Sequence, residues 1–319
     1  MNLFKRPKSR VLLAGAAAAV VLVGAAVAQE RWYPSPYGAG DTLGAVNNLS
    51  PQGVKRAAAL VRQGKVYSLA IPTGPDSPVY GNRRYTVAIS PAPGGNTTPN
   101  GTGRVTSHDE RVTTSMGIGT QLDGLGHLGI DHHYYNGLTG AELNTPQGFK
   151  KLELSNVPPI VTRGVVIDMA RHFGVPIMKA GQAFNRAEIQ AAARAQKVTI
   201  RKGDVVLFHT GWMKTIETDK ALYNRSEPGL GEDGAIWLAD QGVVAVGADN
   251  IALEVLPPVT PGRSFIVHQT LLAKKGVHIL ENINTAPLVA DGVKEFLFVL
   301  GQPRFVGTVQ VVVNPIAIR

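Results

Sequence analysis

Three short aliphatic runs in the second half of the chain set the fold class. They cover residues 165–169, 205–208 and 243–246, and Gly or Asp bounds each run. Short β-branched runs of this kind are typical of strands that are buried on both faces. Helix-forming stretches separate the runs, and strands that alternate with helices predict a sheet covered by helices. We therefore expect one α/β domain with a mixed central sheet.

Local capping signals predict where helices begin and end. Asn185 is a favoured N-cap residue, and Glu188 completes a capping box for the helix that follows. Ser50 before a proline predicts a second helix start, and Gly64 suits the position after that helix ends. The expected elements are, in chain order, an irregular arm over 29–50, a helix over 51–63, a strand over 66–71, a long excursion over 72–104, helices over 186–196, 233–241 and 268–275, an extended segment over 277–280, and strands over 296–300 and 308–313.

The first 28 residues have the pattern of a secretory signal peptide. Four basic residues precede an apolar run over 11–23, and a small-residue A-x-A site ends at Ala28, before Gln29. The apolar run is short and rich in alanine for a membrane span, and an uncleaved N-terminal anchor is the alternative. We expect cleavage near Gln29, which mass spectrometry of the mature protein would detect. The mature chain over 29–319 is then periplasmic or secreted, without stable membrane association.

Composition narrows the possible partners and chemistry. Removing the four basic residues of the signal segment, which holds no acidic residue, takes the formal net charge from +9 to +5, and no basic cluster is interleaved with aromatic residues. Nucleic acid is therefore not expected as a partner. The chain has no cysteine, so a metal site would need His, Asp or Glu. A P-loop, a G-x-S-x-G elbow and an H-E-x-x-H pair are also missing, which removes common nucleotide-binding and hydrolase classes.

The densest candidate site lies between Gly117 and His127. Asp123 and His127 stand four residues apart among four glycines. Glycine lets the backbone approach a ligand or a metal closely, and the stretch lacks the periodicity of a helix. The alternative is an ordinary glycine-rich turn, with Asp123 as a cap and His127 on the surface.

A second candidate pairs His268 with Glu281. His268 opens the expected helix over 268–275, and Glu281 ends the strand that follows, so that adjacent ends of the two elements can converge. Period-two alternation places Glu281 on the same face as Ile279 and directs His278 to the other face. An acid on a buried face needs a partner or a metal. The alternative is a salt bridge from Glu281 to an arginine or a lysine.

Two further predictions concern the ligand and the assembly. His209 follows a strand and precedes a Gly-Trp pair, so we expect it either to contact a small-molecule substrate or to be a satisfied buried histidine. The aromatic residues of the arm are expected to pack, or to cover a pocket on a neighbouring subunit. We expect a homodimer or a higher homo-oligomer.

The glycine-rich stretch resembles the H-x-G-T-H-x-D-x-x-x-H motif of the cyclase family, the group that contains kynurenine formamidase and isatin hydrolase. The residues that match the motif are Gly119, Thr120, Asp123 and His127. Gly117 and Gln121 stand where the motif has its two front histidines. The variant motif thus lacks two nitrogen ligands.

Further segments carry the same resemblance. The family has a histidine followed about a dozen residues later by a glutamate, and His268 with Glu281 is similar to that pair. The segments 40–47 and 204–212 are similar to the longer members, so that the resemblance spans most of residues 31–316. It implies a single α/β domain with a mixed central sheet or barrel-like core flanked by helices, of the swivelling β/β/α, kynurenine formamidase-like type.

The resemblance also implies a mechanism. Asp123, His268 and Glu281 would bind one divalent ion per chain, Zn²⁺ or Mn²⁺, and His127 would be the general acid/base. Gln121 would orient water or substrate, or offer its amide oxygen. The implied function is a hydrolase that opens a C–N or C–O bond in a small amide, lactam, lactone or ester by metal-bound hydroxide. The alternatives are a polyketide-type cyclase or dehydratase, and a non-catalytic periplasmic relative that binds a small molecule.

Overall fold

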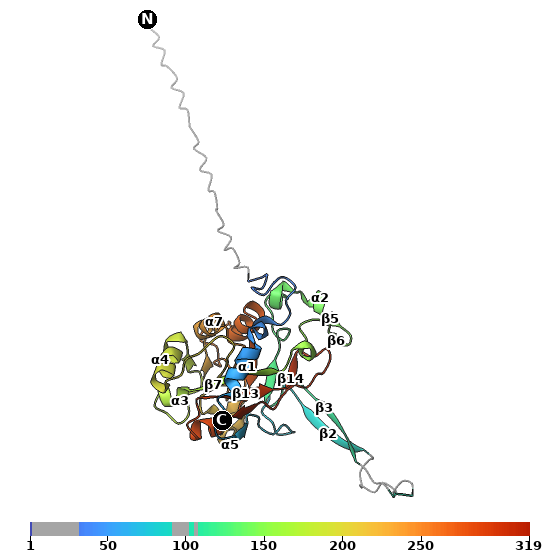
Figure 1. Cartoon of the computed structure of the whole chain (residues 1–319). Helices are drawn as coiled ribbons and strands as arrows, with labels where there is room; N and C mark the ends of the chain where they lie inside the picture. The colour runs from blue at the N-terminus through green and yellow to red at the C-terminus, as the bar shows by residue number, and fades with distance from the viewer. Residues whose placement is uncertain (2–31, 91–101, 105–107) are drawn as a thin grey trace. The chain divides into compact units, whose positions relative to one another are not determined.

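A nine-stranded mixed sheet forms the centre of the fold (Figure 1). Its strands, in spatial order, are β1 (Val66–Ser68), β15 (Ile316–Ile318), β13 (Glu295–Leu300), β7 (Ile160–Asp168), β9 (Val205–His209), β11 (Ala245–Ala248), β12 (His278–Glu281), β4 (Gln121–Asp123) and β14 (Gln310–Val312). The four strands from β7 to β12 are parallel, and the strands on either side of them pair antiparallel. The predicted α/β class with a mixed sheet is confirmed.

The computed structural model describes residue 1 and residues 32–90, 102–104 and 108–319. Residues Trp32–Arg319 form one compact unit. The predicted signal peptide, apart from its first residue, lies outside the described residues. Among the helices that are described, none is both long and apolar enough to cross a membrane.

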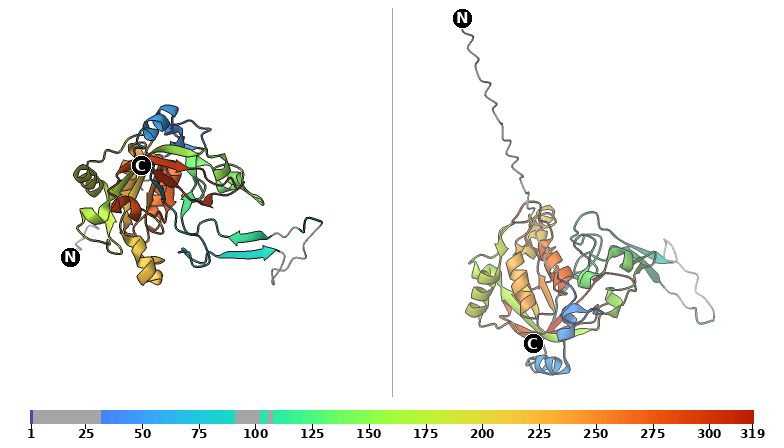
Figure 2. Two further views of the ribbon diagram at one scale, coloured as in Figure 1. Left: turned by 60° about the horizontal axis from the view of Figure 1, so that its bottom comes forward. Right: turned by 90° about the horizontal axis from the view of Figure 1, so that it is seen from above.

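Helices lie on both faces of the sheet (Figure 2). The described α-helices are α1 (Pro51–Ala58), α2 (Gly140–Leu143), α3 (Met169–His172), α4 (Arg186–Gln196), α5 (Thr215–Thr218), α6 (Lys220–Tyr223), α7 (Glu232–Asp240), α8 (Ile266–His268) and α9 (Ala286–Ala290). A π-helix over Gln269–Lys274 continues α8. Strand residues of alternating parity, such as Val206 and Leu207, face the two different cores, because side chains alternate across a sheet.

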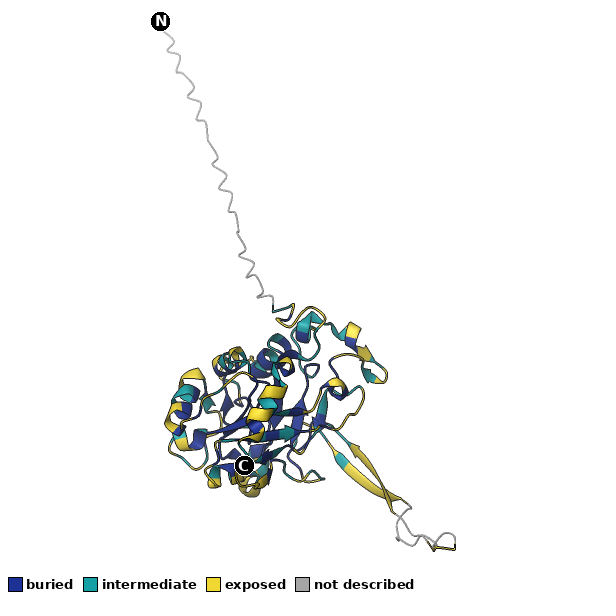
Figure 3. Ribbon diagram, viewed as in Figure 1, coloured by how far each residue is buried: buried dark blue, intermediate teal, exposed yellow. Residues whose placement is uncertain are grey.

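Two short sheet pairings and a hairpin lie outside the central sheet. The pairs are β8 (Ala183–Phe184) with β10 (Gly229–Leu230), and β5 (Asn144–Thr145) with β6 (Gly148–Phe149). The hairpin joins β2 (Tyr85–Ser90) to β3 (Asp109–Thr114) and extends away from the body. Both of its strands are largely exposed (Figure 3). The predicted long excursion over 72–104 therefore contains a strand whose partner lies beyond the excursion.

Several helices and strands end at other residues than predicted, because tertiary contacts replace their local hydrogen bonds. The helix expected over 51–63 ends at Ala58, because the chain then tightens into turns and the N–H of Gln63 donates to the carbonyl of Arg319. The strand expected over 66–71 ends at Ser68, and the N–H of Leu69 bonds to Pro315. The helix over 186–196 and its capping box at Asn185 agree with the prediction, because both depend on local signals.

Candidate metal centre

The glycine-rich stretch contains a buried strand rather than only a turn. Strand β4 spans Gln121–Asp123, and all three of its residues are buried. It lies between β12 and β14 in the sheet. The alternative in which Asp123 caps a surface turn is therefore wrong.

Strand register places the acidic side chains on one face. In the antiparallel pair of β4 and β12, Gln121 lies opposite Glu281 and Asp123 lies opposite Ile279. On the other side of β4, Gln310 lies opposite Asp123. Residues that pair across antiparallel strands have neighbouring side chains on the same face. Asp123 and Glu281 therefore approach each other although 158 positions separate them in the sequence.

The third member of the cluster, His268, comes from the helix that covers this face. It ends α8, where the short helix passes into the π-helix. Its Nδ1 lies 2.5 Å from Oε1 of Glu254, and its backbone N–H donates to the same oxygen. The contact with Glu254 fixes the orientation of the ring, so that Nε2 points towards Asp123 and Glu281. Sequence analysis did not single out Glu254, because neither its neighbours nor its spacing marks it.

The ligand atoms of Asp123, His268 and Glu281 all lie within 4.8 Å of one another. Nε2 of His268 is 3.7 Å from Oδ2 of Asp123 and 3.2 Å from Oε1 of Glu281. Atoms that share one divalent ion at roughly 2.0–2.2 Å stand about 3–4 Å apart. These three residues thus form a cluster that can hold a divalent metal ion.

Side-chain amides occupy the remaining carboxylate oxygens. Nε2 of Gln121 donates to Oδ1 of Asp123 at 3.0 Å and to Oε2 of Glu281 at 2.6 Å. Nε2 of Gln310 donates to the same Oδ1 of Asp123 at 2.9 Å. Oδ2 of Asp123 is buried and has no hydrogen-bond partner. A buried carboxylate oxygen without a donor is costly, and a bound cation would satisfy it, so the residues present fit a metal.

The charges of the buried carboxylates also favour a cation at this site. Burial, together with the charge of Asp123, raises the pKa of Glu281 to about 7. Burial alone would lower the pKa of His268, but its hydrogen bonds to Glu254 and Glu281 raise it to about 10. Two buried carboxylates that face each other are thus stabilised by a positive charge between them. The alternative salt bridge from Glu281 to a lysine or an arginine is wrong for the described residues, where Glu281 pairs with His268.

His127 lies at the edge of the cluster. The turn after β4 returns it to Asp123, and its Nε2 is 3.9 Å from Oδ2 of that residue. Its side chain is 19% exposed, whereas those of Asp123 and His268 are 0% and 2% exposed. Burial lowers the pKa of His127, and the charge of Asp123 opposes that shift. His127 is therefore the histidine of this cluster that solvent or a substrate can reach.

The two positions that depart from the family motif have different environments. Gln121 uses its amide nitrogen on both carboxylates and so supports them; its predicted contact with substrate stays a prediction. At Gly117, an added Cβ would lie 2.7 Å from Cζ of Arg83 and 2.7 Å from Nε2 of Gln310. Side chains from other segments therefore fill the space next to Gly117.

His209 lies outside the cluster. Its Nδ1 is 2.8 Å from Oγ1 of Thr285 and 3.2 Å from Oδ2 of Asp249. Burial would lower the pKa of His209, but the hydrogen bond to Asp249 raises it. These contacts describe a buried histidine with satisfied hydrogen bonds, one of the two predicted outcomes. The predicted substrate contact of His209 stays a prediction.

Replacing Glu254 should weaken metal binding without removing a ligand. In Glu254→Ala, the ring of His268 loses the acceptor that fixes its orientation, and we expect the dissociation constant for Zn²⁺ to rise roughly 10- to 100-fold. Competition with a chromophoric chelator measures this constant. Glu254→Gln keeps an acceptor oxygen, so the loss of Zn²⁺ affinity should be smaller in this variant.

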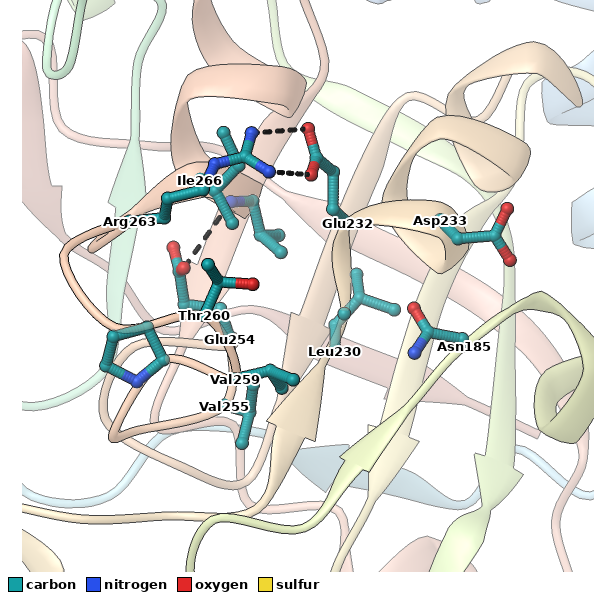
Figure 4. Close-up of a pocket in the computed structure, with 13 residues that line it drawn as sticks. Asn185, Leu230, Glu232, Asp233, Glu254, Val255, Val259, Thr260, Arg263 and Ile266 are labelled. Atoms are coloured by element: carbon teal, nitrogen blue, oxygen red, sulfur yellow. Dashed lines mark hydrogen bonds and ion pairs between the residues drawn. The ribbon is translucent and has the colours of Figure 1, made fainter.

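Glu232→Gln is a matched control for this prediction. Glu232 and Glu254 line the same cavity of about 250 Å³ (Figure 4), but Glu232 pairs with Arg263 instead of His268. Its replacement should leave the affinity for Zn²⁺ unchanged. Equal effects of the Glu232 and Glu254 variants would contradict an orienting role for Glu254.

The chain is similar to known proteins in sequence and in structure. Residues 67–255 match the model of the family described as "Putative cyclase". A crystal structure of a novel cyclase is 29% identical, covers 89% of this chain and 96% of its own, and has a TM-score of 0.81. No curated protein matches the sequence.

Two more distant structures share the fold. A predicted metal-dependent hydrolase from Bacillus stearothermophilus is 20% identical, with 79% of this chain and 97% of that chain covered and a TM-score of 0.53. Isatin hydrolase A from Ralstonia solanacearum is 15% identical, with 84% and 95% covered and a TM-score of 0.60. The mixed sheet flanked by helices is thus the fold of these proteins too.

Proposed function

The chain belongs to the cyclase family, and from that premise we propose that it is a metal-dependent hydrolase that opens a C–N or C–O bond in a small amide, lactam, lactone or ester. The observation that carries the proposal is the convergence of Asp123, His268 and Glu281 beside the partly exposed His127. The predicted metal-dependent hydrolase from Bacillus stearothermophilus and isatin hydrolase A from Ralstonia solanacearum share this fold.

The residues of this site would have separate roles in metal binding and in proton transfer. Asp123, His268 and Glu281 would hold a Zn²⁺ or Mn²⁺ ion, which when bound polarises a carbonyl and lowers the pKa of water. Glu254 holds the ring of His268 through Nδ1, so that Nε2 faces Asp123 and Glu281; a bound ion would take the place of the proton on Nε2. Gln121 and Gln310 fix the carboxylates and leave Oδ2 of Asp123 available.

His127 is the group that we assign to proton transfer. Its Nε2 lies close to the ligand atom of Asp123, so that a molecule held at the cluster would be within its reach. It would take a proton from the attacking water at Nε2 and return it to the leaving amine or alkoxide. A positioned general acid/base typically contributes 10²–10⁴ in rate.

A screen of small lactones, lactams, formamides and esters tests the proposed reaction. Purified protein is stripped with chelator, reloaded with Zn²⁺ or Mn²⁺, and the products are identified by mass spectrometry. We expect products that have gained one water, formed by the reloaded protein and not by the stripped protein. Loss of water or ring closure without gain of water would instead identify the cyclase or dehydratase alternative. Binding without any turnover would identify the non-catalytic alternative.

Two further properties belong to the proposal. We place the activity in the periplasm or outside the cell, as the N-terminal pattern indicates, and we expect a homodimer or a higher homo-oligomer. Cell fractionation tests the location, and light scattering of the purified protein tests the assembly. A cytoplasmic or monomeric protein would overturn the corresponding expectation.

A further inference from the structure

The side chain of Arg83 lies near the metal cluster, and its guanidinium is permanently charged. Arg83 lies two residues before β2, where the backbone N–H of Ser115 donates to the carbonyl of Arg84 and the N–H of Arg84 donates to Oγ of Ser115. Its side chain is partly buried, and one of its five N–H donors is used on the carbonyl of Gly117 at 2.6 Å. Within the described residues, no carboxylate lies within 4.0 Å of this guanidinium. The undescribed segments 91–101 and 105–107 contain no acidic residue.

The position of the guanidinium depends on Gly117. The Cβ that Gly117 lacks would meet Cζ of Arg83 at 2.7 Å and Nε2 of Gln310 at 2.7 Å, and that Nε2 donates to Asp123. A single side chain, Gln310, thus links the space beside the guanidinium to the metal cluster. The charge of Arg83 also acts on Glu281 and His127, where it contributes a lowering of both pKa values.

The net charge of the site determines whether an anionic substrate can bind beside the metal, and Arg83 changes that charge. Three buried carboxylates lie in the cluster or directly behind it: Asp123 and Glu281 belong to the cluster, and Glu254 contacts its His268. A divalent ion would offset two of these charges and leave one negative charge, which would repel an anion. Arg83 offsets the third. The site would then be neutral on balance and would carry one positive group whose remaining donors have no described acceptor.

We propose that Arg83 forms a carboxylate-binding subsite beside the metal cluster, so that the enzyme acts on substrates that carry a carboxylate next to the bond that is opened. A guanidinium binds a carboxylate through two parallel N–H donors, which fixes orientation as well as charge. The subsite would hold the substrate in one register against His127 and the cluster. The substrate class rests on the proposed function, whereas binding of the carboxylate does not.

Binding of benzoate to the zinc-loaded protein tests the subsite without turnover. Isothermal titration calorimetry compares benzoate with benzamide, which has a similar shape and no charge. In Arg83→Gln we expect the dissociation constant of benzoate to rise roughly 10- to 100-fold, the range for a charge-assisted hydrogen bond. The dissociation constant of benzamide should not change.

Three other variants distinguish loss of the subsite from general effects on charge or folding. Arg84→Gln removes the same charge one residue away on an exposed side chain and should bind benzoate as the parent does. Gly117→Ala introduces a Cβ that displaces the ends of the Arg83 and Gln310 side chains, and it should weaken benzoate binding per zinc-loaded chain, with the zinc content measured on the same sample. Arg83→Lys keeps the charge but not the paired donors, and it should recover only part of the affinity.

The outcomes distinguish failure of the subsite from failure of the proposed function. Unchanged benzoate binding in a folded, zinc-loaded Arg83→Gln protein would overturn the subsite, even if the parent is an active hydrolase. Loss of benzoate binding in Arg83→Gln would support it, even if no substrate is ever hydrolysed. For a hydrolysed compound with a carboxylate, Arg83→Gln should raise KM far more than it lowers kcat. The amide-capped form of that compound should show no such increase.

Discussion

Protein purified without chelator is expected to carry close to one divalent ion per chain, and Asp123→Asn or Glu281→Gln should remove most of it. Each variant loses a charged ligand from a set of three, and three ligands leave no redundancy. We expect the affinity to fall by at least about 100-fold, because a partner that only orients a ligand is already worth 10–100-fold. Elemental analysis of the purified proteins measures the occupancy, and hydrolysis should fall with it.

The ion number follows from the donors at the two altered motif positions. Gly117 has no side chain, and the space beside it is filled by Arg83 and Gln310. Gln121 directs its amide nitrogen, which is a donor, at both carboxylates. Neither position therefore offers a basic nitrogen to a second ion. Two ions per chain would contradict this ligand count, and full activity of ion-free protein would contradict the metal mechanism.

Glu227→Gln is the matched control for the ligand variants. Glu227 is also a fully buried carboxylate, but it accepts backbone N–H groups of Ile251 and Ala252. Its replacement should lower stability and leave the ion content per folded chain unchanged. If this variant lost the ion as readily as Glu281→Gln, the loss would reflect unfolding rather than a missing ligand.

His127→Ala should lower kcat by roughly 10²–10⁴, the usual contribution of a general acid/base, while the ion content stays the same. The physical reason is that the three ligand atoms lie on other residues, whereas Nε2 of His127 faces the cluster from its exposed edge. Steady-state kinetics on a substrate from the screen, together with elemental analysis of the same sample, measures both quantities. Added imidazole should restore part of kcat, because the truncated side chain leaves room for it.

His133→Ala provides the control. His133 lies in the following loop, contacts the carbonyl of Asp131 and stacks on Tyr33, and its loss should change kcat little. A His127→Ala protein that loses the ion but keeps normal activity per bound ion would show that His127 is a ligand. The assigned role in proton transfer would then be wrong.

Features that depend on residues close together in the chain could be predicted from the sequence. The capping box at Asn185 fixed the start of α4, and the aliphatic runs predicted the parallel strands at the centre of the sheet. Alternation along β12 placed Glu281 on the face of Ile279, because the side-chain period of a strand is two. Candidate ligands could be selected by residue type, because a chain without cysteine leaves mainly His, Asp and Glu as metal-binding side chains.

The way in which these residues meet could not be predicted, because it depends on long-range packing. A strand of three residues such as β4 is too short to show a period, and its burial comes from β12 and β14, which lie far along the chain. The same pairing brings Gln310 to Asp123 across 187 positions. Glu254 and Arg83 reach the cluster from separate loops. Contacts between distant segments follow from packing and register, which local pattern does not encode, and they decide which atoms of the ligands remain free.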